Sequence, residues 1–448
     1  MTIDSGSIQS QAKSLAQYEV QRELGQVKRS SEQYKAQLAA VSTLDKALKS
    51  FGSAIKGMQG TDKSMLVSTA AFSKEGMASA TLGAKTQEGR YQLFITQLAS
   101  AHQLSLSGLG SDVGASGSLF IRQNGAEFEV GLAAADSDVD GQVSQEELAA
   151  AINKHSDNKG VKATLARHQG DVSLVLTAQK TGEASKITLR SDDTSSQLSN
   201  PQGLARELSK AADAIVHLGN EHGLKFQQGS NTFKDLIEGV SLTVSKAHSP
   251  SETPLTLDIS RDKSATKAKV NDFITATNGL LGTFDSLSAP GGEKGGRGAL
   301  AGDASIRAVK TLLNTELRKS FTDAGGKSLM DFGLRAGADG KLKLDDKVFD
   351  KMLDTHPQAL DKLFTGKDQL LDSLSKKLAT FTSGSSGSMK ARKDNLNTQL
   401  QRVEEKRKGI DKKYAAHYQR YLKQYSAMAQ VVASMEQTFR MFQTEPKK

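Results

Sequence analysis

Residues 20–58 read VQRELGQVKRSSEQYKAQLAAVSTLDKALKSFGSAIKGM, and the spacing of their apolar side chains decides the fold class. Mostly apolar positions recur at alternating steps of four and three residues from Val20 to Met58, with one extra step of three between Val41 and Leu44. Such a heptad repeat is typical of a helix that packs lengthwise on another helix, and the extra step interrupts the repeat once. This stretch therefore predicts a long N-terminal helix with a partner helix.

The C-terminal end of the chain supplies that partner. Two linked heptad runs extend from Leu396 to Phe442. At a rise of about 1.5 Å per residue, each terminal helix would be roughly 75–80 Å long. The chain has only 6 prolines in 448 residues, which favours uninterrupted helices. We therefore expect the two ends of the chain to form an antiparallel stem.

Between the two ends, the apolar period changes from that of helices to that of strands and back. Alternating residues predict strands at 90–95, 128–132, 172–176 and 187–189, and a hairpin-like pair at 240–244 and 255–259. A short helix is expected at 145–153, and the helical period returns from residue 265.

These patterns predict an α+β multidomain protein in which each domain is nested inside the next. The predicted parts are terminal coiled-coil legs (1–40 and 415–448), a helical-bundle domain (41–68 and 263–414), a β-containing head domain (69–119 and 223–262) and an outer β-rich head domain (120–222).

The composition excludes several classes of protein. The absence of cysteine rules out disulfides, thiolate metal sites and cysteine nucleophiles. No run approaches the roughly 18 apolar residues of a membrane span, and residues 1–6 lack the features of a cleaved signal peptide. The net charge of +9 does not indicate nucleic-acid binding. The last 60 residues hold 14 Lys and Arg against 6 Asp and Glu, and the tyrosines beside them occupy heptad positions.

One motif has a specific chemistry. Residues 136–147 read DSDVDGQVSQEE and match the calcium loop of an EF-hand at every defined position. The expected ligands are Asp136, Asp138, Asp140, the backbone carbonyl of Gln142, and Glu147. The alternative is an acidic turn before a helix that Ser144 and Glu147 cap. No cofactor is expected to be required, and calcium is the one ion that the sequence indicates.

No other motif indicates catalysis. The chain has no G-x-S-x-G or H-E-x-x-H motif, and its eight histidines are scattered singly. The sequence therefore predicts a protein that is not an enzyme.

Several segments, in order along the chain, resemble those of the flagellar filament-capping protein family, also called hook-associated protein 2. They are GRYQLFITQLASAH (89–102), AIN (151–153) followed by GVKA (160–163), SNTFKDLIEGVSL (230–242), LAGD (300–303), DGKLKLD (339–345) and YLKQYSAM (421–428). SGSI (5–8) departs from the G-S-G-L-D-type opening that the family usually has.

The resemblance implies an extracellular protein at the tip of the bacterial flagellum, exported by the flagellar apparatus without a cleaved signal. Its subunits would form a homo-oligomeric ring, of about five copies, that promotes flagellin insertion and prevents flagellin loss. Hook–filament junction proteins and an export chaperone are further expected partners, and the outer domains can add an adhesive role. The terminal helices would act as legs that contact other subunits or flagellin through Leu24, Val27, Leu38, Tyr421, Tyr425, Met428 and Val432.

Two other classes of protein have to be considered. A hook–filament junction protein or a flagellin-like filament protein would share the coiled-coil ends and the A-I-N motif, but we would not expect it to carry the S-N-T-F segment. A cell-wall hydrolase would need paired carboxylates in a cleft, and none stand out beyond the acidic loop.

Overall fold

The computed structural model describes residues 5–60, 63–193, 197–292 and 296–443. The extreme ends of the predicted legs, 1–4 and 444–448, therefore lie outside the described residues. The chain divides into two compact units, of which the first combines residues 1–65 with 263–448 and the second spans residues 66–262. One unit is mainly helical and the other contains most of the strands, which confirms the predicted α+β multidomain class.

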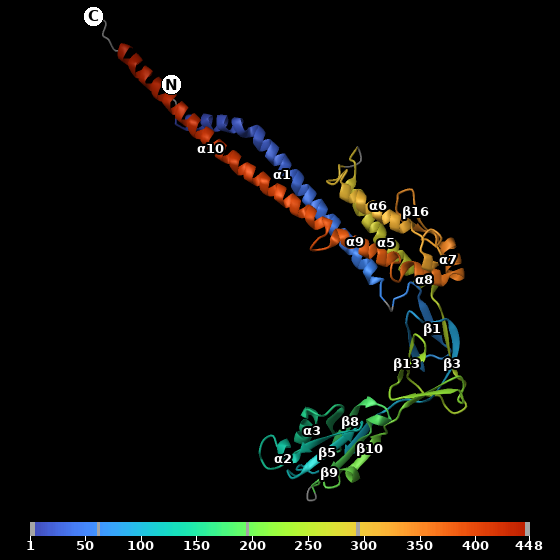
Figure 1. Ribbon diagram of the computed structural model, residues 1–448. Helices are drawn as coiled ribbons and strands as arrows, with labels where there is room; N and C mark the ends of the chain where they lie inside the picture. Colours follow the sequence, from blue (N-terminus) through green and yellow to red (C-terminus); the bar gives the residue numbers. More distant parts are fainter. Residues whose placement is uncertain (1–4, 61–62, 194–196, 293–295, 444–448) are drawn as a thin grey trace. The chain divides into compact units, whose positions relative to one another are not determined.

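Two long helices dominate the first unit. Helix α1 (Ser5–Gly57) and helix α10 (Ser388–Gln443) lie side by side along most of their length (Figure 1). Neither helix contains a proline, so no backbone donor is lost within them. The predicted terminal helices are thus confirmed, although α1 begins 15 residues before Val20, the first residue of the heptad repeat.

A helical bundle surrounds the C-terminal third of α1. Its elements are α5 (Lys263–Ser288), α6 (Ala304–Arg318), η2 (Thr322–Ala324), β16 (Leu334–Ala336), β17 (Leu342–Leu344), α7 (Asp346–Thr355), α8 (Pro357–Phe364) and α9 (Leu370–Thr382). Helix α1 contacts α5 and α9 there, and Leu44, Leu48 and Ile55 have no exposed surface. The extra step of three at Val41 therefore lies where α1 enters the bundle.

The part of the second unit nearest its chain ends consists of two antiparallel sheets. One has the order β1 (Ser68–Phe72), β15 (Leu255–Arg261), β3 (Gly89–Gln97), β11 (Ala214–Leu218) and β12 (Leu224–Gln228). The other has the order β13 (Thr232–Ile237), β14 (Val240–Val244) and β2 (Ala78–Leu82). Their shared core includes Leu93, Ile95 and Leu257.

The hairpin-like pairing expected between residues 240–244 and 255–259 is wrong. Strand β14 pairs with β13 and β2, whereas β15 pairs with β1 and β3. The connecting segment contains Pro250 and Pro254 and leads from one sheet to the other instead of turning back.

The outer part of the second unit has its own core. A four-stranded sheet has the order β10 (Ala205–Ser209), β4 (Ala101–Leu106), β8 (Asp171–Thr181), β7 (Val161–His168), and a three-stranded sheet has the order β6 (Ala126–Gly131), β5 (Ser118–Gln123), β9 (Ile187–Ser191). The short elements α2 (Leu132–Ala135), α3 (Gln145–Lys154), η1 (Glu183–Ser185) and α4 (Pro201–Leu204) complete it. Leu104 and Leu106 belong to this core, although the sequence placed them in the β-containing head domain that ends at residue 119. Ala214, which the sequence placed in the outer domain, belongs instead to the shared core of the two sheets described above.

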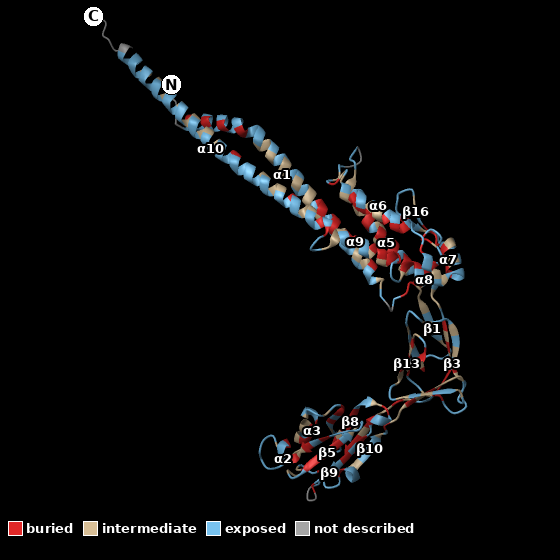
Figure 2. Ribbon diagram, viewed as in Figure 1, coloured by how far each residue is buried: buried red, intermediate tan, exposed pale blue. Residues whose placement is uncertain are grey.

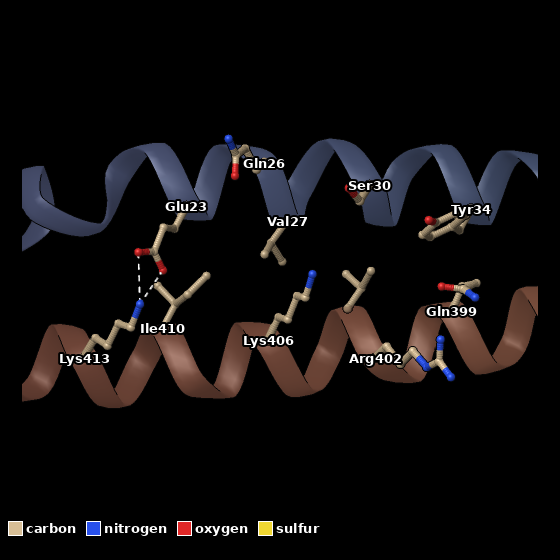
Figure 3. A pocket seen from close by; sticks show the side chains of 11 residues that line it. Glu23, Gln26, Val27, Ser30, Tyr34, Gln399, Arg402, Lys406, Ile410 and Lys413 are labelled. Carbon is tan, nitrogen blue, oxygen red and sulfur yellow. Dashed lines mark hydrogen bonds and ion pairs between the residues drawn. The ribbon is translucent and has the colours of Figure 1, made fainter.

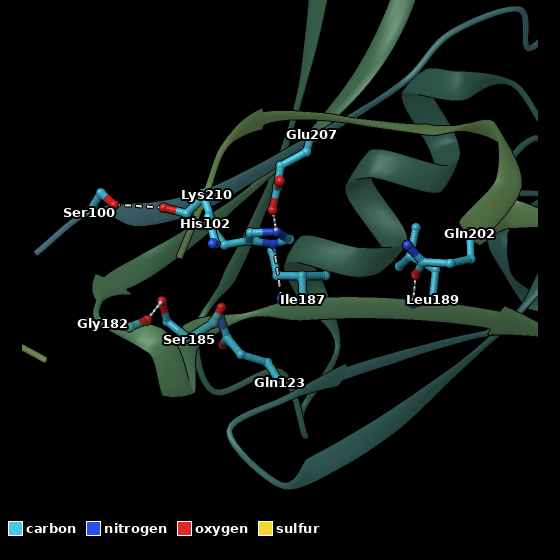
Figure 4. A network of polar contacts seen from close by, with 10 residues as sticks. All are labelled: Ser100, His102, Gln123, Gly182, Ser185, Ile187, Leu189, Gln202, Glu207 and Lys210. Atoms are coloured by element: carbon cyan, nitrogen blue, oxygen red, sulfur yellow. Dashed lines mark hydrogen bonds and ion pairs between the residues drawn. The ribbon is translucent and has the colours of Figure 1, made fainter. Parts of the chain in front are cut away.

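A buried histidine ties the strands of this outer part together (Figure 4). His102 is only 1% exposed, and its Nδ1 accepts a hydrogen bond from the Ile187 amide at 3.0 Å. Its Nε2 lies 2.9 Å from Oε1 of Glu207. Both ring nitrogens are therefore satisfied, and the residue links β4, β9 and β10 as a structural element.

Candidate functional site: the helical stem and the acidic loop

Polar contacts at three levels of the stem define how α1 and α10 pair. Lys393 Nζ lies 2.6 Å from Asp45 Oδ2, Lys413 Nζ lies 3.0 Å from both Glu23 oxygens, and the Tyr421 hydroxyl donates to Glu19 Oε1 at 2.7 Å. Each step toward the start of α1 is thus matched by a step toward the end of α10. One antiparallel register connects the bundle to the far end of the stem.

The contact nearest the bundle is a buried ion pair. The Asp45 side chain is 8% exposed and lies 3.0 Å from Lys49 Nζ as well as 2.6 Å from Lys393 Nζ. Burial alone would raise the pKa of Asp45, but the two ammonium groups outweigh it and hold that pKa below its usual value. Asp45 therefore fixes the register at the point where the stem begins.

Most of the residues predicted to make leg contacts lie partly buried between or beside the two helices. These are Leu24, Val27, Leu38, Tyr421, Tyr425 and Val432. Whether they also touch another chain stays a prediction. Phe442, at the end of the predicted seam, lies outside the described side chains.

The first turns of α1 contain contact residues that the heptad pattern missed. Ile8, Ala12 and Ala16 precede Val20 at steps of four residues and are at most 8% exposed. Alanines carry little apolar surface, so they did not stand out as a seam. Their spacing of four is nevertheless a detectable signal, because small side chains on one face allow two helices to approach closely.

Met428 lies apart from the predicted contacts that are partly buried. It is 48% exposed, and Val431, Met435 and Phe439 farther along α10 are 57–66% exposed. The steps of three and four between these residues place them on one side of the helix. They continue the heptad face of Tyr421 and Tyr425, so this end of α10, which Figure 2 colours mainly as exposed, carries one apolar stripe of which these four residues are the uncovered part.

The middle of the stem is not closely packed. Between Glu23 and Tyr34 of α1 and between Gln399 and Lys413 of α10, the helices leave an open groove of about 670 Å³ (Figure 3). Val27, Val403 and Ile410 contribute apolar surface to it.

The acidic loop lies between two helices in the outer part of the second unit. The predicted strand at 128–132 ends one residue early, because Leu132 begins the single turn of α2 that leads into the loop. Helix α3 follows the loop. Carboxylate oxygens of Asp136, Asp138 and Glu147 lie within 4.8 Å of one another, whereas Asp140 is not part of this group.

The backbone of the loop wraps around its first aspartate. The Asp136 carboxylate accepts hydrogen bonds from the amides of Val139 (2.7 Å), Asp140 (3.3 Å) and Gly141 (2.9 Å). Gly141 has a φ of +82°, which glycine adopts without strain. The Gln142 amide donates to Asp140 Oδ1 at 2.8 Å, and a bond from the Gln142 carbonyl to calcium stays a prediction.

Glu147 has a second role that the sequence also indicated. Its carboxylate and the Ser144 hydroxyl form a capping box at the start of α3. Hydrogen bonds from Ser144 and Ser137 lower the pKa of Glu147 to about 2. The Asp140 amide favours the charged form of Asp138, but desolvation and the carboxylates of Asp140, Glu147 and Asp136 together raise the pKa of Asp138. The loop thus concentrates negative charge on oxygen ligands of the kind that calcium prefers.

Among the described residues, no helix is long and apolar enough to cross a membrane.

Comparison with known proteins places the chain in one family. Residues 4–102 match the family model "Flagellar hook-associated protein 2 N-terminus", and residues 211–437 match "Flagellar hook-associated protein 2 C-terminus". The lateral flagellar hook-associated protein 2 of Vibrio parahaemolyticus is 36% identical over 83% of this chain and 84% of its own length. The B-type flagellar hook-associated protein 2 of Pseudomonas aeruginosa is 27% identical over 88% of this chain and 85% of its own length.

A solved structure agrees with this result. The D1-D2-D3 domains of the flagellar cap protein FliD from Escherichia coli align with a TM-score of 0.66 and 25% identity, over 80% of this chain and 99% of that one. The two family models together leave unmatched the segment 103–210, which contains the acidic loop. The chain belongs to the flagellar hook-associated protein 2 family.

Proposed function

We infer that this protein caps the tip of the bacterial flagellar filament and promotes the insertion of flagellin subunits there. The observation that carries the inference is the stem, in which α10 packs against α1 while the apolar residues from Met428 to Phe439 stay uncovered. A large uncovered apolar surface favours contact with another protein. The proposed role is mechanical and not catalytic.

We further propose how the cap is assembled. Several copies, about five, form a closed ring, and their legs contact flagellin. The protein leaves the cell through the flagellar export apparatus without a cleaved signal, with an export chaperone as its partner before export and the hook–filament junction proteins as neighbours at the start of assembly. The uncovered stripe supports this proposal, because a monomer alone leaves it in water.

The ring can be tested on the purified full chain. We expect sedimentation velocity to show oligomers whose population rises with protein concentration, and electron microscopy to show rings at the tips of filaments grown from added flagellin. A single monomeric species over about a hundredfold range of concentration would contradict the proposal, since a heterologous ring interface must respond to mass action.

We also propose that the loop at 136–147 binds calcium through Asp136, Asp138, Asp140, Gln142 and Glu147. Three of the carboxylates already lie within 4.8 Å of one another, which is compatible with oxygen ligands about 2.3–2.6 Å from one ion. A bound calcium ion would offset the mutual repulsion that raises the pKa of Asp138.

Millimolar calcium is therefore expected to stabilise the outer part of the second unit. At a hundredfold excess over Kd the gain in unfolding free energy is about 2.7 kcal/mol, and differential scanning calorimetry of the full chain with calcium or with a chelator measures it. Asp138→Asn should remove the effect and leave the cap of α3 intact, because Asp138 makes no bond to Ser144.

Glu146→Gln is the matched control for this test, since Glu146 is exposed, lies next to Glu147 and bonds to Arg167 instead of the loop. We expect the control to keep the full calcium response. A wild-type melting curve that calcium leaves unchanged would mean that the loop is only an acidic turn before a capped helix.

A further inference from the structure

The groove in the middle of the stem carries positive charge that has no counterpart. It is lined by Arg402 and Lys406, and neither forms an ion pair with any carboxylate in the described part of the chain. Lys413, at one end of the groove, pairs with Glu23 instead (Figure 3). The α1 side offers Gln26, Ser30 and Tyr34, so its middle contains no acidic group.

The groove is also incompletely filled. Two helices that pack alone normally interlock their side chains, and a gap of this size loses the contacts that its lining would otherwise make. Ser30 is small, so it fills little of the space between the two helices. Lys406 occupies a position that faces α1, where a charged side chain lowers the stability of a two-helix pair. The local sequence therefore does not favour a closed two-helix seam here.

The shape of the groove suits a third helix. It extends between Gln399 and Lys413 of α10, which at about 1.5 Å per residue corresponds to roughly 20 Å, or about four helical turns. Apolar surface from Val27, Val403 and Ile410 alternates along it with the guanidinium of Arg402 and the ammonium of Lys406. A helix that places a carboxylate between apolar side chains would cover both kinds of surface.

We propose that this groove is a docking site for an amphipathic, acidic helix of a partner protein. The partner's apolar side chains pack on Val27 and Val403, which are partly exposed, and its carboxylates pair with Arg402 and Lys406. Such pairing would place three helices around one seam. The proposal rests on the groove alone and does not depend on the cap function.

The test uses the purified full chain and two fluorescent peptides of about 21 residues, long enough to form helix when bound. Both repeat leucine on one face; one carries glutamate beside the leucines and the other carries lysine. Fluorescence anisotropy should show that the acidic peptide binds at least about tenfold more tightly than the basic one. This difference should shrink when the salt concentration rises from about 50 mM to about 500 mM.

Charge reversal in the groove gives the decisive comparison. Arg402→Glu with Lys406→Glu should reverse the preference between the two peptides. The matched control, Lys408→Glu with Lys412→Glu, makes the same change of charge on the same helix at residues that do not line the groove. The control should keep the preference for the acidic peptide. Equal binding of the two peptides to the wild type, or an equal loss in both double variants, would overturn the proposal.

A further variant controls for the case in which charge reversal unfolds the stem. Lys406→Leu removes one charge and fills part of the groove with an apolar side chain, so circular dichroism should show unchanged helix content. The acidic peptide should lose at least about tenfold in affinity. If this folded variant binds the acidic peptide as tightly as the wild type, the groove is not its docking site.

Discussion

Replacing Tyr421, Tyr425 and Val432 together with aspartate is expected to abolish filament growth. All three side chains are partly buried along the stripe that faces α1. A fully buried side chain of this kind contributes about 1.5–3 kcal/mol, and partial burial gives less for each. The substitution at Tyr421 also removes the hydrogen bond to Glu19 and places a second carboxylate beside it. The three effects together should separate α1 from α10 at the far end of the stem.

The phenotype follows from the proposed role of the legs. In a strain that lacks its own copy of the gene, the triple variant should be exported, yet the cells should be non-motile in soft agar. Flagellin should accumulate in the culture medium, where an immunoblot measures it. The helical bundle and the second unit should stay folded, because the changed residues lie far along α10 from the bundle.

The control adds the same three charges to the other side of α10. Gln430, Ser434 and Gln437 are exposed and lie on the opposite side of α10 from the apolar stripe. Their replacement by aspartate should leave motility close to normal. Filaments of normal length in the first variant, or an equal defect in the control, would show that the α1–α10 contact does not anchor the cap.

The uncovered stripe can be separated from the stem contact in the same assay. Met428→Asp with Met435→Asp should leave the helix content of the purified protein unchanged, because both side chains are exposed. If the uncovered stripe docks on another chain, this double variant should nevertheless release flagellin into the medium. If it releases none, the uncovered stripe does not contact another chain.

The sequence predicted the elements whose signal is local and periodic. The terminal helices followed from heptads, and α3 followed from a short helical period with a capping box at Ser144 and Glu147. The start of α1 was missed because Ala12 and Ala16 bury little surface and resemble solvent-facing residues. The turn at Leu132 was missed because that residue continues the alternation of the strand before it.

Features that depend on distant contacts could not be predicted in the same way. The pairing of β14 with β2, and of β15 with β1 and β3, joins residues more than a hundred positions apart, such as Arg90 opposite Asp258. The acidic loop was predictable as a set of ligands, but the bonds from Ser137 to Glu147 were not. The groove at Lys406 could not be predicted. The heptad pattern places residues on one face of a helix, but it does not show whether the side chains of the facing helix fill the space between them.

Phe364→Ala in the helical bundle should cause a large loss of stability for a single substitution. Phe364 has no exposed surface, and its ring packs edge-on against Phe273, with centroids 5.2 Å apart and planes at 88°. Removing a buried phenylalanine costs about 3–5 kcal/mol through lost contacts and the cavity left behind. Because the chain has no tryptophan, circular dichroism during urea unfolding is the appropriate measurement.

Met330→Ala provides the control, since Met330 is 57% exposed in the same unit and its loss should change stability by about 0.5 kcal/mol or less. The calorimetric transition of the second unit should not move in either variant, because its cores share no residue with the bundle. A shift of less than about 1 kcal/mol for Phe364→Ala would mean that the bundle collapses around the cavity.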